Sequence, residues 1–235
     1  MSKENQQPVK AFDLYKKSVD LIKKNQTTFL VLAALPALLS VFSSAKGDKG
    51  AQNPMFPFST NMTPSRLGAV LGVTFIAAIL VIAVILIVYV MTEALYYKAA
   101  KGQKPSFGEL WEVAKKYILR LLGLGIVTAL AIVGGLILLI VPGIIAIRRY
   151  ILAPYVMLDK DMGILDSMSE SARLTKPYSM SVYSLLGVSI LLSIVAGILQ
   201  SAIGVVGSIL GLLLTLGYAF APAIRYFELV KLDKK

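Results

Sequence analysis

The sequence contains no histidine and no cysteine among its 235 residues. Without cysteine, the chain cannot form disulfides, perform thiol catalysis or bind metals through thiolates. Without histidine, it lacks the commonest general base and the commonest metal ligand of proteins. These absences weigh against most hydrolase and metalloenzyme mechanisms. We therefore expect a protein that is not an enzyme and needs no metal or other cofactor.

Acidic residues are also scarce, since 13 Asp and Glu stand against 24 Lys and Arg, which gives a net charge of +11. Such a charge could indicate a nucleic-acid partner. Here the basic residues flank long apolar segments, and that arrangement is typical of membrane orientation and of contact with anionic lipid headgroups. We expect lipid partners and no nucleic acid.

Charge is missing altogether from Tyr178 to Ile224, a stretch of 47 residues. As one continuous helix it would extend about 70 Å, more than twice the roughly 30 Å hydrocarbon core of a bilayer. It therefore predicts two membrane crossings that fold back on each other. With 57% hydrophobic residues overall, the chain is expected to be an all-α, polytopic integral membrane bundle.

Apolar runs predict six transmembrane helices, at about residues 27–45, 67–97, 117–141, 143–158, 178–202 and 206–227. With both termini in the cytoplasm, 19 Lys and Arg lie inside and 3 outside. A five-span alternative places 12 on each side, so the positive-inside rule favours six spans. Residues 1–26 then form a cytoplasmic amphipathic arm, and residues 27–235 form the membrane domain.

The first apolar run has a second interpretation. It follows a basic segment and ends in Ser43-Ser44-Ala45, which loosely matches a signal-peptidase site. Cleavage there would leave the topology of the other five spans unchanged.

Three cytoplasmic segments share a pattern, because each predicts a short amphipathic helix lying flat at the interface before a pair of spans. Ser106 with Glu109, and Ser167 with Glu170, have the spacing of a capping box at a helix start. Internal triplication and independent selection of interfacial helices both explain the similarity. The predicted apolar faces are Phe12, Tyr15, Val19 and Ile22; Phe107, Leu110, Trp111 and Ala114; and Leu165, Met168 and Ala172.

Arg148 and Arg149 fall inside the fourth predicted span, where a charged side chain costs several kcal/mol unless it is paired, snorkels or faces water. They are the candidate ligand-binding residues, for a phosphate headgroup, an anionic substrate or a partner's carboxylate. The alternative is a structural role, by snorkelling or by pairing with Glu93.

Two further patterns predict helix packing. Pro142 and Gly143 are expected to form a tight hairpin between the third and fourth spans. Small residues recur every four positions along the fifth and sixth spans, which predicts close packing of these helices or, alternatively, homo-oligomerisation. The key packing positions are Ser193, Gly197, Gly207 and Gly211.

An acidic loop contains Asp159, Asp161 and Asp166. Its Asp-x-Asp spacing is found in some divalent-metal sites, which would allow a membrane enzyme acting on lipids. A solvated turn before the third amphipathic helix explains the same residues, and we prefer that interpretation.

Residues 117–225 resemble the multi-span membrane domain of bacterial glycerophosphoryl diester phosphodiesterases and related stand-alone bacterial membrane proteins of unknown function. The resemblance rests on residues 141–144, Arg148, Pro154, Asp159 and the segment 164–176. It implies a six-helix module in the bacterial cytoplasmic membrane. The family's phosphodiesterase activity belongs to a separate soluble domain that uses histidine, so this activity is not implied here.

The sequence therefore favours a non-enzymatic membrane anchor or scaffold that organises anionic lipids or binds a membrane or cytoplasmic protein partner. The alternative is a small transporter or channel for an anionic or lipidic solute, with Arg148 or Arg149 in its path.

Overall fold

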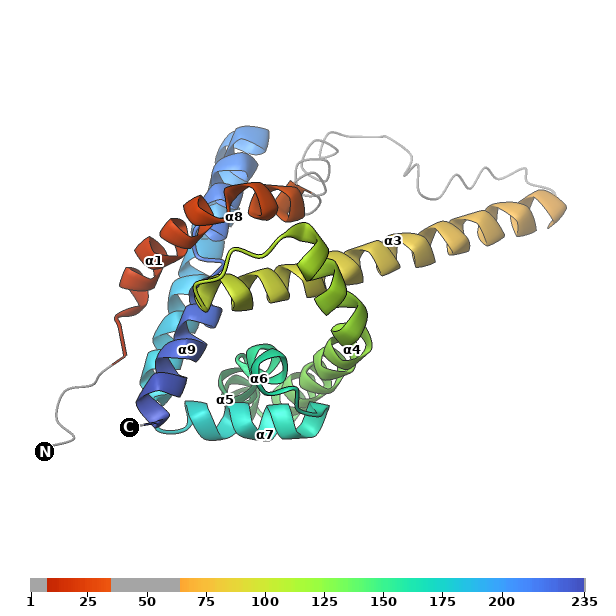
Figure 1. Cartoon of the computed structure of the whole chain (residues 1–235). Coiled ribbons are helices and arrows are strands. Elements are labelled where there is room, and N and C mark those ends of the chain that lie inside the picture. Colours follow the sequence, from red (N-terminus) through yellow and green to blue (C-terminus); the bar gives the residue numbers. More distant parts are fainter. Residues whose placement is uncertain (1–7, 35–63, 235) are drawn as a thin grey trace, which may run out of the picture.

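The structure, a computed structural model, describes residues 8–34 and 64–234. These residues form helices joined by short connections, without a strand among them. A helical segment at residues 26–34 follows α1 after a turn at Asn25. The other helices are α1 (Ala11–Lys24), α3 (Pro64–Ala100), α4 (Phe107–Leu138), α5 (Ile140–Tyr150), α6 (Ala153–Lys160), α7 (Ile164–Thr175), α8 (Ser179–Leu216) and α9 (Ala221–Asp233) (Figure 1).

Four helical stretches in the described part of the chain are long and apolar enough to cross a membrane: Ala78–Ala100, Phe107–Leu138, Ile140–Lys160 and Ser179–Asp233. This supports a helical membrane protein but does not confirm six spans. The first predicted span, residues 27–45, is helical at 27–34, and the rest of it lies outside the described residues.

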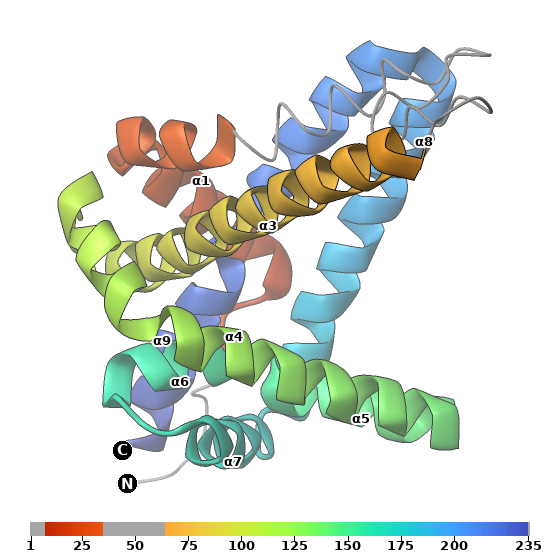
Figure 2. The ribbon, with the colours of Figure 1, turned by 90° about the vertical axis from the view of Figure 1, so that its right-hand side faces the viewer.

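The longest stretch, Ser179–Asp233, folds back on itself within α8 (Figure 2). Ile203 and Gly204 have non-helical backbone angles, and Gly204 has φ +56°, which favours glycine. Both residues lie between the predicted fifth and sixth spans, residues 178–202 and 206–227. A Cβ at Gly207 would overlap the carbonyl oxygen of Leu199, so the absence of a side chain lets the two arms of the hairpin touch.

The hairpin between α4 and α5 lies slightly earlier than predicted. Leu139 adopts an extended backbone (φ −164°, ψ 148°) and separates the helices, whereas Pro142 and Gly143 lie in the first turn of α5. Pro142 fits there because the first turn of a helix does not need its missing N–H. A Cβ at Gly135 would lie 2.9 Å from the backbone nitrogen of Gly143, so the two glycines allow close contact between α4 and α5.

The predicted fourth span, residues 143–158, is not one helix. Ile151 and Leu152 form a turn after α5, and Pro154 starts the separate short helix α6. The second predicted amphipathic helix is also not separate, because it continues into the third span as the single 32-residue helix α4. Its predicted cap is confirmed, since the Ser106 hydroxyl accepts a hydrogen bond from the Glu109 backbone N–H at 3.3 Å.

Helix α1, part of the predicted arm of residues 1–26, is packed against α9. Ala11, Leu14 and Ser18 are buried, and Phe12, on the apolar face predicted from the sequence, is 68% exposed. The Ser18 hydroxyl accepts a hydrogen bond from the backbone N–H of Phe220 at 3.1 Å. The side of α1 that packs against protein is therefore not the predicted apolar face, which leaves Phe12 exposed.

Helix α7 differs from its prediction for the same reason. Gly163 is its N-cap, and Ser167 lies inside the helix, where its hydroxyl donates to the Gly163 carbonyl. The buried face includes Ser167 and Ser171 beside Met168, whereas Leu165 is 70% exposed. The hydroxyls of Ser167 and Ser171 donate to backbone carbonyls on this face. A pattern of apolar residues in the sequence therefore does not identify this face as the buried one.

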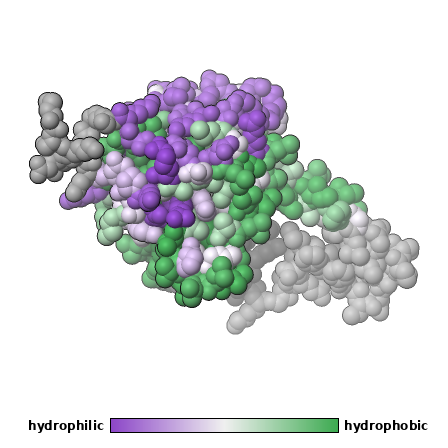
Figure 3. Space-filling model, turned by 90° about the horizontal axis from the view of Figure 1, so that it is seen from below, coloured by the Kyte–Doolittle hydropathy of each residue, from purple (hydrophilic) through white to green (hydrophobic). Residues whose placement is uncertain are grey.

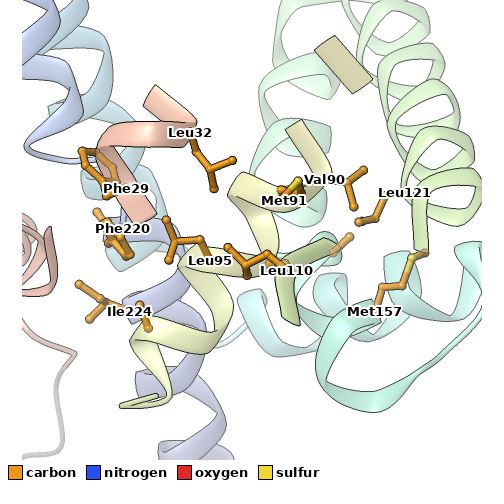
Figure 4. Close-up of a cluster of buried hydrophobic side chains, with 14 of the residues drawn as sticks. Phe29, Leu32, Val90, Met91, Leu95, Leu110, Leu121, Met157, Phe220 and Ile224 are labelled. Atoms are coloured by element: carbon orange, nitrogen blue, oxygen red, sulfur yellow. The ribbon is translucent and has the colours of Figure 1, made fainter. Parts of the chain in front are cut away.

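The core lies where residues 26–34, the second half of α3, the start of α4 and the start of α9 meet (Figure 4). Phe220 is fully buried, with its ring centroid 4.7 Å from that of Tyr96 and 5.6 Å from that of Phe29. Outside this core, α3 projects from the molecule and exposes apolar side chains such as Val73 and Phe75 (Figures 1 and 3). Such exposed apolar surface is expected of helices that contact lipid.

We predict that Gly207→Ala destabilises the protein by about 1–3 kcal/mol, because the new methyl group forces the arms of α8 apart. Thermal unfolding in detergent measures the change. Gly197→Ala is the matched control, because a Cβ there meets no atom within 4 Å and alanine favours a helix. Equal melting temperatures for the Gly207 variant and wild type would contradict the packing.

Candidate functional site

Arg148, a candidate ligand-binding residue, is buried between helices. Its Nη1 atom donates a hydrogen bond of 3.0 Å to the carbonyl oxygen of Thr175, the last residue of α7. Its guanidinium carbon lies 5.8 Å from the ring centroid of Tyr183 on α8. The last carbonyls of a helix lack intrahelical partners and carry partial negative charge. Arg148 therefore joins α5 to the end of α7 and to α8.

Arg149 is exposed, so the structure does not bring the two arginines together in one site. Its contribution to packing comes from its main chain, where the carbonyl accepts a hydrogen bond of 2.6 Å from the Ser171 hydroxyl. No ion pair joins Arg148 to Glu93 among the described residues. The arginine uses a backbone acceptor in place of the predicted carboxylate.

The acidic residues of the α6–α7 segment bind different partners. Asp159 accepts hydrogen bonds from the hydroxyls of Tyr97, at 2.8 Å, and Tyr226, at 2.9 Å. Asp161 forms ion pairs with Lys116, at 2.9 Å, and Arg120, at 2.7 Å. Lys116 is the main cause of a lowered pKa at Asp161. Within the described residues, no cluster of three Asp or Glu side chains is arranged to hold a metal.

A charged network joins α7 to α9. Arg173 pairs with Glu170 at 2.8 Å and with Asp233 at 2.6 Å, and Lys160 pairs with Glu170 at 2.6 Å. Hydrogen bonding to Arg173 is the largest cause of the low pKa of Glu170, about 2. This network fixes the end of α9 against α7.

Helix α9 also holds the start of the chain. Arg225 is fully buried, and it donates to the carbonyl oxygen of Val9 at 2.8 Å and to Glu228 at 2.9 Å. Glu228 in turn pairs with Lys17 of α1 at 3.0 Å. We call the surface formed by α1, α7, α9 and the α6–α7 connection the charged face. Figure 3 shows hydrophilic residues gathered on one part of the surface.

Glu93, which the sequence suggests only as a partner for Arg148, belongs to a second candidate site. It lines an open pocket of about 330 Å³ between α3, α4 and the α5–α6 junction, together with Tyr89, Thr128 and Tyr150. The hydroxyls of Tyr89 and Tyr155 hydrogen-bond to its carboxyl group. Its position as a single acid in the apolar run 67–97 was the signal that could have identified this site.

The small residues of α8 divide into two groups. Gly207 and Gly211 contact the opposite arm of the hairpin, as their tight surroundings show. Gly197 has open space around it, and Ser193 lines a separate pocket of about 240 Å³ with Ser189 and Thr215. Gly207 and Gly211 therefore contact the opposite arm directly, whereas Ser193 and Thr215, on opposite arms, border the same pocket.

Comparison with known proteins gives one match. The model of an uncharacterised protein family, UPF0259, matches residues 8–224. The chain belongs to this family. No curated protein and no solved structure matches it. The comparisons do not link this UPF0259 chain to glycerophosphoryl diester phosphodiesterases, so that part of the resemblance stays a prediction.

We predict that Arg148→Met lowers the stability of this UPF0259 protein by about 2 kcal/mol, since the carbonyl of Thr175 loses its donor. Arg149→Met is the matched control, because its exposed side chain is removed and its carbonyl contact with Ser171 remains. Thermal unfolding in nanodiscs compares the two variants. Equal losses in both would show that Arg148 has no special structural role.

A second prediction concerns pH. The folded state lowers the pKa of Glu170 from its ordinary 4.5 to about 2, so the ionised carboxylate stabilises the fold above pH 4.5. This contribution is lost as the pH falls from about 4.5 to 2. The difference in melting temperature between wild type and Glu170→Gln should therefore be largest near neutral pH and shrink towards pH 3. A difference that stays constant over this range would contradict the assignment.

Proposed function

We propose that this protein is a non-enzymatic membrane module that organises anionic lipids, with its charged face turned towards the headgroups of the cytoplasmic leaflet. The observation that carries this proposal is the fixed position of α1, which packs against α9 and exposes lysines beside an exposed aromatic ring, Phe12. Lysines next to an exposed ring are typical of helices that lie at a lipid interface.

The charge balance of the charged face supports this role. Three carboxylates of α7 and α9, Glu170, Glu228 and Asp233, are paired with basic residues of the same face, as described above. On α1 and at its N-cap, in contrast, lysines outnumber aspartates. Five of these lysines are exposed: Lys10, Lys16, Lys17, Lys23 and Lys24. Of these, Lys17 pairs with Glu228. A lysine near an anionic membrane surface contributes about 1 kcal/mol of attraction.

Exposed aromatic residues at the start of α4 support a position at the membrane–water interface for this end of the helix. Trp111 is 40% exposed and Phe107 is 52% exposed. Tryptophan is enriched at membrane–water interfaces, because its ring is apolar and its N–H needs a polar partner. The positive-inside rule then places both termini in the cytoplasm, and the resemblance of residues 117–225 supports a bacterial cytoplasmic membrane.

Transport of an anionic or lipidic solute through Arg148 or Arg149 has less support. Arg148 is buried and donates to the Thr175 carbonyl. Neither arginine lines the pockets at Glu93, at Lys116 or at Ser193. The proposal also assigns no catalytic role to Asp159 or Asp161, whose carboxylates bind other side chains of the chain itself.

The test replaces Lys16, Lys23 and Lys24 together by glutamine. At about 1 kcal/mol for each lysine, we expect roughly a hundredfold weaker preference for phosphatidylglycerol over phosphatidylcholine. The measurement is native mass spectrometry of the lipids retained by the full-length protein from mixed nanodiscs.

The matched control replaces the same three lysines by arginine, which keeps the charge and should keep the preference. Asp13→Asn with Asp20→Asn should strengthen it. An unchanged lipid preference in the glutamine variant would overturn the proposal, and a protein retained in stoichiometric amount by both variants would indicate a protein scaffold.

A further inference from the structure

The pocket at Glu93 is lined by residues of three of the stretches that are long and apolar enough to cross a membrane. Tyr89 and Glu93 come from α3, Gly125 and Thr128 from α4, and Tyr150 from the end of α5. Glu93 precedes Lys98 by five residues, which places it about 7–8 Å along the helix from the basic end of α3. Its volume of about 330 Å³ lies at the lower end of the range for small-molecule sites.

The charge of this pocket is not balanced by the protein. The Oε2 atom of Glu93 is buried and has no hydrogen-bond partner in the described part of the chain. The pocket lining contains no Lys and no Arg. Arg148, for which Glu93 was the predicted partner, donates to the carbonyl oxygen of Thr175 instead. A carboxylate at this depth is costly unless a proton or a cation neutralises it.

The chemistry of the lining selects among cations. It offers one carboxylate with tyrosine and threonine side chains, whereas Ca²⁺ takes six to eight oxygen ligands and usually several carboxylates. One carboxylate with neighbouring aromatic rings suits an ammonium group, which pairs with the acid, donates to hydroxyl oxygens and is attracted to aromatic faces.

We propose that this pocket binds an ammonium group, with Glu93 as its counter-ion and Tyr89 and Tyr150 as its aromatic walls. The ammonium belongs either to the headgroup of an aminophospholipid or to a free amine. This site has the opposite charge preference to the charged face and does not depend on the function proposed above.

The experiment uses the full-length protein in nanodiscs of phosphatidylglycerol, which carries no amine. In one arm, phosphatidylethanolamine is added to the bilayer, and native mass spectrometry measures how much the protein retains. In the other arm, free ethanolamine or spermidine is added, and the shift in melting temperature is measured. Retention of the lipid identifies a headgroup site, and stabilisation by the free amine identifies a soluble ligand.

Glu93→Gln keeps the size of the side chain and removes its charge, and we expect it to weaken binding at least tenfold in the arm where wild type binds. Glu112→Gln is the matched control, because this carboxylate lies on the exposed surface of α4, where its side chain is 70% exposed. It should bind as wild type does. Equal binding by the Glu93 variant and wild type, or no amine bound by wild type in either arm, overturns the proposal.

A second variant keeps the test decisive if Glu93→Gln does not fold. Gly125 lines the pocket, and a Cβ added to it meets no atom within 4 Å, so Gly125→Leu adds a bulky side chain at the pocket wall and leaves Glu93 unsubstituted. Loss of amine binding in this variant supports the site. Retention of amine binding overturns it.

Discussion

The buried guanidinium of Arg225 is the interaction on which the arrangement of the chain ends depends. A charged side chain with no exposed surface must be compensated by the protein, and here the Val9 carbonyl and the Glu228 carboxylate do so. Because Val9 lies two residues before the first residue of α1, this compensation fixes the segment that leads into α1 against α9. Removing one partner would leave a buried charge without compensation, so the contact is much more specific than apolar packing alone.

The position of α9 in turn determines the rest of the fold. Phe220, just before α9, packs on Tyr96 of α3, and Asp233, at its end, pairs with Arg173 of α7. The same α3 carries Glu93, and α5, which Arg148 attaches to α7, contributes Tyr150 to the pocket. The charged face and the Glu93 pocket are therefore two products of one set of contacts between helices that are distant in sequence.

Sequence reasoning predicted what depends on local chemistry. Long apolar runs predicted α3, α4 and α8, the Ser106 cap predicted the start of α4, and the length of the uncharged stretch predicted that α8 folds back. Sequence reasoning failed where a residue contacts a partner that is distant in the sequence. The buried side of α1 faces Phe220, about 200 residues away. The acceptor for Arg148 is a main-chain carbonyl, and the identity of the residue that carries it does not predict this contact. The α4–α5 turn was misplaced because Pro142 is compatible with a first helical turn as well as with a break.

The contact between α1 and α9 also affects the order in which the protein assembles. Val9 and Arg225 are separated by 216 positions, so α1 leaves the ribosome long before its partner exists. At about 5–20 residues per second, this interval lasts on the order of 10–40 seconds. During that time the apolar side of α1 has no protein surface to cover it, and the nearby bilayer or a chaperone must shield it. Truncation of the last helix would therefore leave the first helix without its partner, so both ends of the chain would be lost from the fold together.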